Sequence, residues 1–191
     1  MKKHFIILII LISFITGCSK YRELNHLSII STITIDYKEG EYHLTLQEIL
    51  PEKGENKVDY NYKYHESTSP NLSKAFNNII GNSPKDIYLE KVQNVIISEK
   101  EKDKITKEFF KYLKKEKNIN PNSNYIISKG NLKKVLKISN DYNYLSSILK
   151  SKKQNLLQLE KKIKKKQKLK VPVIKIDNKE ILFVKYNYLQ V

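Results

Sequence analysis

Alternating hydrophobic and polar residues dominate the first part of the chain. Residues 27–36 are rich in isoleucine and threonine, and residues 42–50 place apolar side chains on one face and polar side chains on the other. This period of two predicts two β-strands. Gly40 lies between them and supplies the backbone freedom that a tight turn requires. The pattern therefore predicts an antiparallel β-hairpin.

A third strand is predicted where Val58, Tyr60, Tyr62 and Tyr64 alternate with polar residues. We call the three aromatic residues of this strand the tyrosine stripe. Two interpretations are open, namely an exposed binding surface and a face that packs under a neighbouring helix. The second interpretation is favoured, because aromatic side chains bury a large apolar area.

Further strands are predicted over residues 87–98 and 125–128, and two more over residues 171–176 and 181–189. Residues 95–97 form an unbroken aliphatic run inside the first of these segments. A continuous apolar run of this kind is typical of a strand that is buried on both faces of a sheet.

Apolar residues at helical spacing predict four helices. The first covers residues 70–80, with Ser69 as its N-cap, and the next two cover residues 101–117 and 131–138. The last is a long helix over residues 142–168, in which leucines recur at three- and four-residue intervals among many lysines.

The order of these elements predicts an α+β fold, namely a mixed sheet that starts with an antiparallel hairpin and carries helices packed on it. The chain divides into a signal peptide (1–17), an N-terminal α+β domain (18–140), a Lys-rich amphipathic helix (141–170) and a terminal β-hairpin (171–191). The body after the signal peptide is long enough for a core of its own.

The first 18 residues have the layout of an export signal. Two lysines precede an apolar run over residues 5–15, which is too short to span a membrane, and Gly17 precedes Cys18, the only cysteine. This ending looks like a bacterial lipobox, so we predict cleavage between Gly17 and Cys18 and lipid attachment to the Cys18 sulfur. The alternatives are a plain cleaved signal or an uncleaved anchor with an incidental cysteine.

The chain is strongly basic, with 36 basic and 20 acidic residues and a net charge of +16. Such an excess is typical of proteins that bind nucleic acid or an anionic membrane surface. An exported, lipid-tethered body lies beside anionic lipid, and Arg22 is the only arginine, whereas nucleic-acid binders favour arginine. We therefore expect the membrane surface and no nucleic acid as a partner. A third interpretation is that an A+T-rich genome inflates the lysine content.

Lysines are concentrated in the predicted long helix, and the lysines that we expect to contact anionic headgroups are Lys161, Lys162, Lys164, Lys165 and Lys166. The competing interpretation, which we favour, is a solvated helix whose leucine stripe packs on the domain.

The sequence offers no pattern typical of catalysis. The four histidines have unrelated spacings and no accompanying ligand motif, so no metal site and no cofactor is predicted. Asp36, Glu48 and Asp59 form an acid pair only if the fold brings two of them together, and the favoured interpretation is that they are surface or turn carboxylates. No glycine-rich phosphate loop and no nucleophile elbow occur among the five glycines. We therefore expect a protein that is not an enzyme.

Several motifs in order resemble one family. Cys18 is followed by Arg22-Glu23-Leu24-Asn25, then by the strand end Ile35-Asp36 and the hairpin partner over residues 42–47. Pro51, the pair Ala75-Phe76 and the segment over residues 88–99 follow. In this order and spacing, residues 14–130 resemble the N-terminal domain of the C subunit of spore germinant receptors, the Ger(x)C-type lipoproteins.

The resemblance implies a non-catalytic lipoprotein subunit of a germinant receptor, held on the outer face of the inner spore membrane. Its partners would be integral membrane subunits of that receptor. The matching motif residues Arg22, Glu23, Leu24, Asn25 and Asp36 would then be candidates for partner contact. The alternative function is a free-standing envelope lipoprotein that binds a ligand or scaffolds other proteins.

Overall fold

A mixed β-sheet runs through the whole computed structural model, which describes residues 24–53, 58–116, 118–139, 144–178 and 180–189. The strand order is β3-β2-β1-β5-β6-β7-β8, and the short β4 pairs with β1 outside this path. The strands are β1 (Leu27–Lys38), β2 (Glu41–Lys53), β3 (Val58–Ser69), β4 (Asp86–Tyr88), β5 (Asn94–Ser98), β6 (Asn124–Lys129), β7 (Leu169–Asp177) and β8 (Glu180–Leu189).

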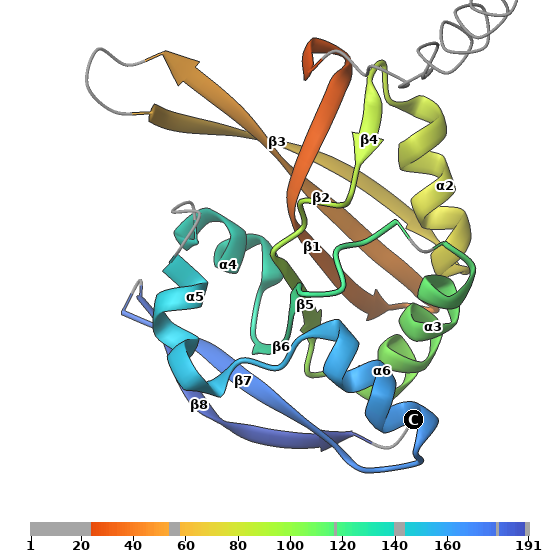
Figure 1. The fold of residues 1–191 in the computed structure, drawn as a ribbon, viewed down its shortest axis with the longest axis vertical. Helices are drawn as coiled ribbons and strands as arrows, with labels where there is room; N and C mark the ends of the chain where they lie inside the picture. The colour runs from red at the N-terminus through yellow and green to blue at the C-terminus, as the bar shows by residue number, and fades with distance from the viewer. Residues whose placement is uncertain (1–23, 54–57, 117, 140–143, 179, 190–191) are drawn as a thin grey trace, which may run out of the picture.

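Helices cover both faces of this sheet (Figure 1). Residues of α2, α3 and α6 pack into one hydrophobic core, and residues of α4 and α5 pack into a second core on the other face. The helical elements are η1 (Leu24–His26), α2 (Leu72–Asn82), α3 (Lys102–Lys115), α4 (Leu132–Ile138), α5 (Tyr144–Leu149), η2 (Lys150–Lys152) and α6 (Leu156–Lys164). The predicted α+β class is confirmed.

The opening hairpin is confirmed in its strands and its turn. Strands β1 and β2 pair antiparallel and close at Lys38 and Glu41. Glu39 and Gly40, the two residues of the turn, have φ angles of 51° and 85°. Positive φ at both positions matches the right-handed twist of the strands, and glycine adopts it at no steric cost.

The centre of the sheet is parallel and buried on both faces. Strands β1, β5, β6 and β7 run in the same direction, and Val95, Ile96 and Ile97 of β5 have no exposed surface. Ile96 packs into the second core, whereas its two neighbours pack into the first. The predicted segment 87–98 is two strands rather than one, because a turn closed by the Val92 N–H and the Leu89 carbonyl separates β4 from β5.

Aromatic residues fill the first core between the sheet and α3. The rings of Phe109 and Tyr125 stack with centroids 5.8 Å apart, and those of Phe76 and Tyr112 stack at 4.1 Å. The buried Tyr125 hydroxyl donates a 2.9 Å hydrogen bond to Thr106 Oγ1. A buried phenol with a partner can stay in an apolar core without a large desolvation cost.

Buried tyrosines should make the fold sensitive to alkali. Burial raises the pKa of Tyr42 to about 12, with Glu108 and Tyr37 adding to the effect, and burial raises the pKa of Tyr112 and Tyr125 still further. Because tyrosines of the unfolded chain ionise near pH 10, the folded state binds more protons above that pH. The contribution of these tyrosines to stability should therefore be constant at neutral pH and fall as the pH rises above about 10.

The expected fall is about 1.4 kcal/mol per pH unit for each protected tyrosine. Urea unfolding at pH 9 and at pH 11 measures it. Tyr125→Phe should reduce the difference between the two values, because it removes one of the three protected phenols. Equal unfolding free energies at pH 9 and pH 11 would contradict the assignment.

The predicted long helix over residues 142–168 is wrong. In this region α5 is followed directly by the 3-10 turn η2, and an extended segment at Lys153 and Gln154 separates η2 from α6. Leu145 and Leu149 of α5 pack into the second core, whereas Leu156 and Leu159 of α6 pack into the first. One straight helix cannot reach both faces of a sheet, so the chain crosses between them around Lys153.

Local hydrogen bonds fix the break between α5 and α6. Asn155 forms a capping box with Gln158, in which each side chain accepts a hydrogen bond from the other residue's backbone N–H. The Gln154 carbonyl accepts from the Tyr125 N–H at 2.8 Å, and the Ser123 carbonyl accepts from the Leu156 N–H at 3.0 Å. The backbone of the crossing is thus bonded to the start of β6 instead of continuing a helix.

Removal of the α6 cap should destabilise the protein. Asn155→Ala deletes the side-chain acceptor at the helix N-terminus, and we expect a loss of about 1 kcal/mol in the free energy of unfolding. Urea unfolding monitored by circular dichroism measures the change. Asn71→Ala, which removes the N-cap of α2, is the reference for an ordinary helix cap. A loss at Asn155 below about 0.3 kcal/mol would mean that the cap does not hold the crossing.

Tyr64 of the tyrosine stripe does not pack under α2, so the predicted packing under a neighbouring helix fails for this residue. Strand register pairs Tyr64 with Gln47, whereas α2 packs on the other face of β3, where Asn78 donates to Ser67 Oγ. Tyr64 is 37% exposed. Helix α2 also begins two residues later than predicted, because β3 continues to Ser69 and Asn71 is the N-cap.

The C-terminal β-hairpin is confirmed and extends the sheet. Strand β7 pairs parallel with β6 and antiparallel with β8, which forms the edge. Leu169, Val171 and Leu189 join the same core as the helices α2 and α3. The segments predicted as 18–140, 141–170 and 171–191 thus share one sheet and its cores wherever the structure describes them.

Candidate functional site

Asp36 is the motif residue whose surroundings are best defined. It lies at the carboxyl end of β1, is 8% exposed, and accepts a hydrogen bond from the Tyr37 N–H at 2.9 Å. Its second oxygen forms an ion pair with the Lys38 ammonium. Both carboxylate oxygens therefore have partners within the chain, and the side chain closes the end of the strand.

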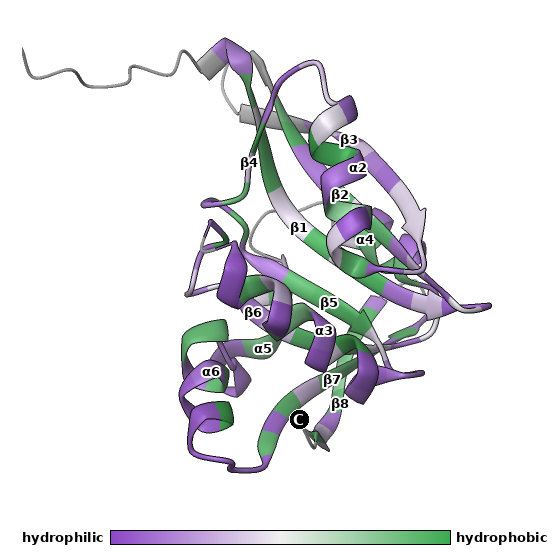
Figure 2. Cartoon of the chain, turned by 90° about the vertical axis from the view of Figure 1, so that its right-hand side faces the viewer, coloured by the Kyte–Doolittle hydropathy of each residue, from purple (hydrophilic) through white to green (hydrophobic). Residues whose placement is uncertain are grey.

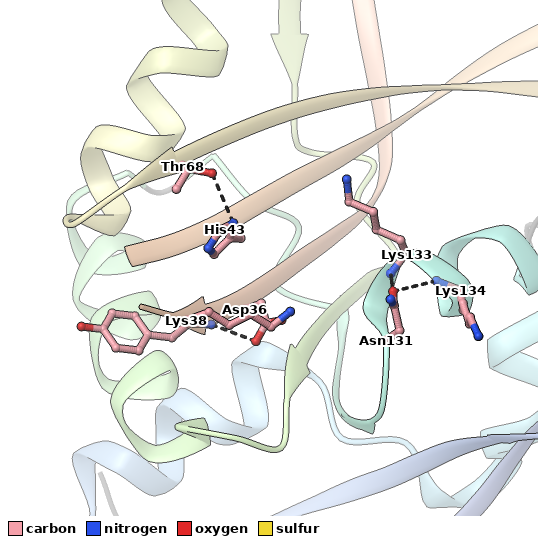
Figure 3. Close-up of polar contacts among 8 residues, drawn as sticks. Asp36, Lys38, His43, Thr68, Asn131, Lys133 and Lys134 are labelled. Carbon is pink, nitrogen blue, oxygen red and sulfur yellow. Dashed lines mark hydrogen bonds and ion pairs between the residues drawn. The ribbon is translucent and has the colours of Figure 1, made fainter. Parts of the chain in front are cut away.

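A polar surface surrounds Asp36 on the face of the hairpin opposite α2 (Figure 3). Register pairs Asp36 with His43, whose Nδ1 lies 3.3 Å from Thr68 Oγ1 of β3. In the same view α4 lies to the right of Asp36 and His43. At the start of this helix, Asn131 Oδ1 accepts hydrogen bonds from the backbone N–H groups of Lys133 and Lys134. Contacts within the chain thus occupy the polar side chains named on this face.

An ion pair ties α4 to the edge strand of this polar surface. Lys133 Nζ lies 2.8 Å from a carboxylate oxygen of Glu66 on β3. Both side chains are largely exposed, so the pair contributes little to stability. It does, however, bring the helix after β6 close to the outermost strand of the opening hairpin.

The remaining predicted motif residues lie at the start of the described chain. Leu24 and Asn25 belong to η1, directly before β1, and Asn25 is exposed. Gly17, Cys18, Arg22 and Glu23 fall outside the described residues. The predicted lipid attachment, cleavage site and first half of the motif therefore stay predictions.

The lysines predicted to contact headgroups occupy α6 and the turn after it. Lys161, Lys164, Lys165 and Lys166 are exposed, and Lys164 pairs with Glu160 at 2.9 Å. Lys162 is half-buried and donates to Gln154 Oε1 at 3.2 Å. Both views place α6 at the end of the molecule opposite η1 and the start of β1 (Figures 1 and 2).

A buried contact between Glu48 and His65 on the α2 face contradicts the interpretation of Glu48 as a surface or turn carboxylate. Glu48 is 3% exposed, and its carboxylate lies 2.7 Å from His65 Nε2. The signal was present, because the alternation of β2 puts position 48 on the same face as Leu44 and Leu46. Asp36 lies on the other face of the sheet, so these two acids do not form a catalytic pair.

A second polar feature is an amide-rich pocket of about 330 Å³ at the start of β6. Most of its amides are engaged in local structure: Asn155 and Gln158 form the α6 capping box, and Asn124 Nδ2 donates to Asn94 Oδ1. The pocket is therefore explained by the crossing from α5 to α6, and we assign no ligand to it.

Neither metal chemistry nor a membrane span emerges from the described part of the chain. No group of three or more His, Cys, Asp or Glu side chains there is arranged to hold a metal ion. None of the helices that the structure describes is long and apolar enough to cross a membrane.

Comparison with known proteins gives the family. The model of the family described as the spore germination protein N-terminal domain matches residues 20–175. This match covers most of the chain, so the protein belongs to the Ger(x)C-type spore germination family and has a role in spore germination. It extends past residue 130, where the sequence resemblance ended, and takes in α4, α5, α6 and most of β7. No curated protein and no solved structure matches the chain significantly.

Proposed function

We propose that this protein is a lipid-anchored, non-catalytic subunit of a germinant receptor complex. The observation that carries the proposal is the family match, which begins at residue 20, two residues after the candidate lipidation site at Cys18. The folded body thus follows directly on the anchor. Its partners in the proposal are integral membrane subunits of the receptor, at the outer face of the inner spore membrane.

The short tether supports a partner close to the bilayer. Residues between Cys18 and η1 span at most about 3.5 Å each, so the start of η1 lies within roughly 20 Å of the anchor. Tethering of this kind raises the effective concentration of the body near membrane subunits. The motif residues Arg22, Glu23, Leu24 and Asn25 fall in this membrane-proximal stretch.

Orientation follows from the same tether. A body that stands on its anchored end presents η1 and the start of β1 to the membrane and α6 to the opposite side (Figure 1). Attraction of the net positive charge to anionic lipid fits this arrangement without a specific contact. The proposal therefore does not rely on headgroup contacts of Lys161, Lys162, Lys164, Lys165 and Lys166.

Deletion of the gene tests the role in germination. Spores without the protein should lose optical density more slowly in nutrient, because the proposed receptor lacks a subunit. The wild-type gene supplied in trans should restore the rate, and a Cys18→Ala gene should restore it poorly. Normal germination of the deletion strain in every nutrient tried would contradict the proposal.

A further inference from the structure

A groove of about 510 Å³ lies between the end of α3 and α6. Its floor is apolar and contains Leu113, Ile119 and Leu156. Leu157 forms one wall, and Lys114 and Lys164 stand at the rim. The site belongs to none of the motifs discussed above, and it lies at the end of the molecule away from η1 (Figure 1).

One wall of the groove is a partly exposed leucine of α6. Leu156 and Leu159 of α6 are buried in the core, but Leu157 is 38% exposed and lines the groove. The Leu157 N–H donates a 2.9 Å hydrogen bond to the Pro121 carbonyl, and Pro121 also lines the groove. This bond ties α6 to the loop before β6, so the wall is held in place before a partner arrives.

Charge gives the groove its selectivity. Its only acid, Glu160, lies 2.9 Å from Lys164 Nζ and is therefore already paired. Lys114 is exposed and has no ion-pair partner among the described residues. Lys161 on α6 and Lys165 directly after it are exposed and add to the positive potential. An occupant with carboxylates beside its apolar side chains complements this rim.

We propose that the groove is a docking site for an acidic amphipathic helix of a partner protein. Large apolar side chains at positions i, i+3 or i+4, and i+7 of that helix would cover Leu113, Ile119 and Leu157. Its Asp or Glu side chains would meet Lys114 and would compete with Glu160 for Lys164. An extended strand is a poorer occupant, because strand addition needs an open sheet edge and the groove walls are helices and a loop.

An anionic lipid surface is the competing occupant. A flat array of headgroups would neutralise the lysines but would leave the recessed Leu113 and Ile119 uncovered. The inference does not depend on lipidation of Cys18 or on membership in a receptor complex.

Peptide binding tests the proposal. The probe is a fluorescein-labelled helical peptide of about 18 residues, with leucines along one face and glutamates flanking them. The protein used is the chain from residue 18 onward, with Cys18→Ser so that the protein carries no lipid. Fluorescence anisotropy should show saturable binding. Leu157→Glu should weaken binding at least tenfold, because it puts a like charge in the wall, and Lys114→Glu should act in the same direction.

Matched controls separate the groove from general charge. Leu182→Glu alters a leucine of similar exposure on β8, and Lys134→Glu alters an exposed lysine on α4, so neither should change the affinity more than twofold. A peptide with lysine in place of glutamate should not bind. Two results with the acidic peptide would overturn the proposal: absence of binding, and an affinity that Leu157→Glu leaves unchanged. A third result would favour the lipid surface instead, namely that the protein binds phosphatidylglycerol vesicles but not the acidic peptide, and that Leu157→Glu reduces the vesicle binding.

Discussion

Cys18→Ala should release this protein from the membrane. Each buried CH₂ of an acyl chain contributes about 0.8 kcal/mol to membrane binding, and two or more chains make an anchor stable. No helix among the described residues offers a replacement span. After cell fractionation, the wild-type protein should therefore sediment with membranes, and the Cys18→Ala protein should not.

A high-salt wash separates the lipid anchor from charge attraction, because salt screens the attraction between a basic body and anionic lipid. The wild-type protein should stay in the pellet after the wash and should incorporate a palmitate analogue. Ser19→Ala, which changes the neighbouring residue, should behave like the wild type. Cys18 would not carry the anchor if the Cys18→Ala protein stayed in the pellet after the salt wash. The same conclusion would follow if the Cys18→Ala protein incorporated as much palmitate analogue as the wild type.

Phe109→Ala should cost more stability than any surface change. Phe109 has no exposed surface, and its ring packs against those of Phe110 and Tyr125, at centroid distances of 5.9 and 5.8 Å. Removal of a buried phenyl ring loses its transfer free energy and leaves a cavity, which costs about 3–5 kcal/mol. That is a large part of the total stability of an ordinary domain.

Urea unfolding measures this loss, and Ile80→Ala is the matched control. Ile80 is 40% exposed on α2, so its truncation should change the unfolding free energy by less than about 0.5 kcal/mol. A loss below about 1 kcal/mol for Phe109→Ala would contradict the assignment of this ring to the centre of the first core.

Local patterns predicted the sheet well because its strands are strongly patterned. The hairpin followed from alternation around Gly40, and the burial of β5 on both faces followed from the aliphatic run Val95-Ile96-Ile97. These features depend on residues that are close in sequence. A period of two also fixed which residues of β3 share a face, but it could not tell which face α2 would cover.

The prediction of one long helix over residues 142–168 was wrong, although the sequence contained a signal against it. The leucine spacing continues from Leu145 to Leu159 as if one face were buried, yet the two halves serve opposite faces of the sheet. Asn155 and Gln158 have the spacing of a capping box, which signals a helix start inside the predicted helix. Leucine periodicity alone therefore predicted one helix through Asn155, where the capping box starts a separate helix, α6.

The candidate site was predictable only in part. Asp36 was singled out by a motif, but its pairing with Lys38 needed the structure. The groove beside Leu157 depends on contacts among α3, α6 and the loop at Pro121, which are far apart in sequence. No sequence period reports such a surface, because it arises only where separate elements meet.

The most direct test of the proposed function is purification of the protein from membranes of dormant spores. Our account predicts that the mild-detergent extract contains the protein in a complex with a polytopic membrane subunit, and that Cys18→Ala reduces recovery of that subunit. The account would be contradicted if the lipidated wild-type protein were recovered without any membrane subunit, and if vegetative cells contained as much of the protein as dormant spores. That result would favour a free-standing envelope lipoprotein.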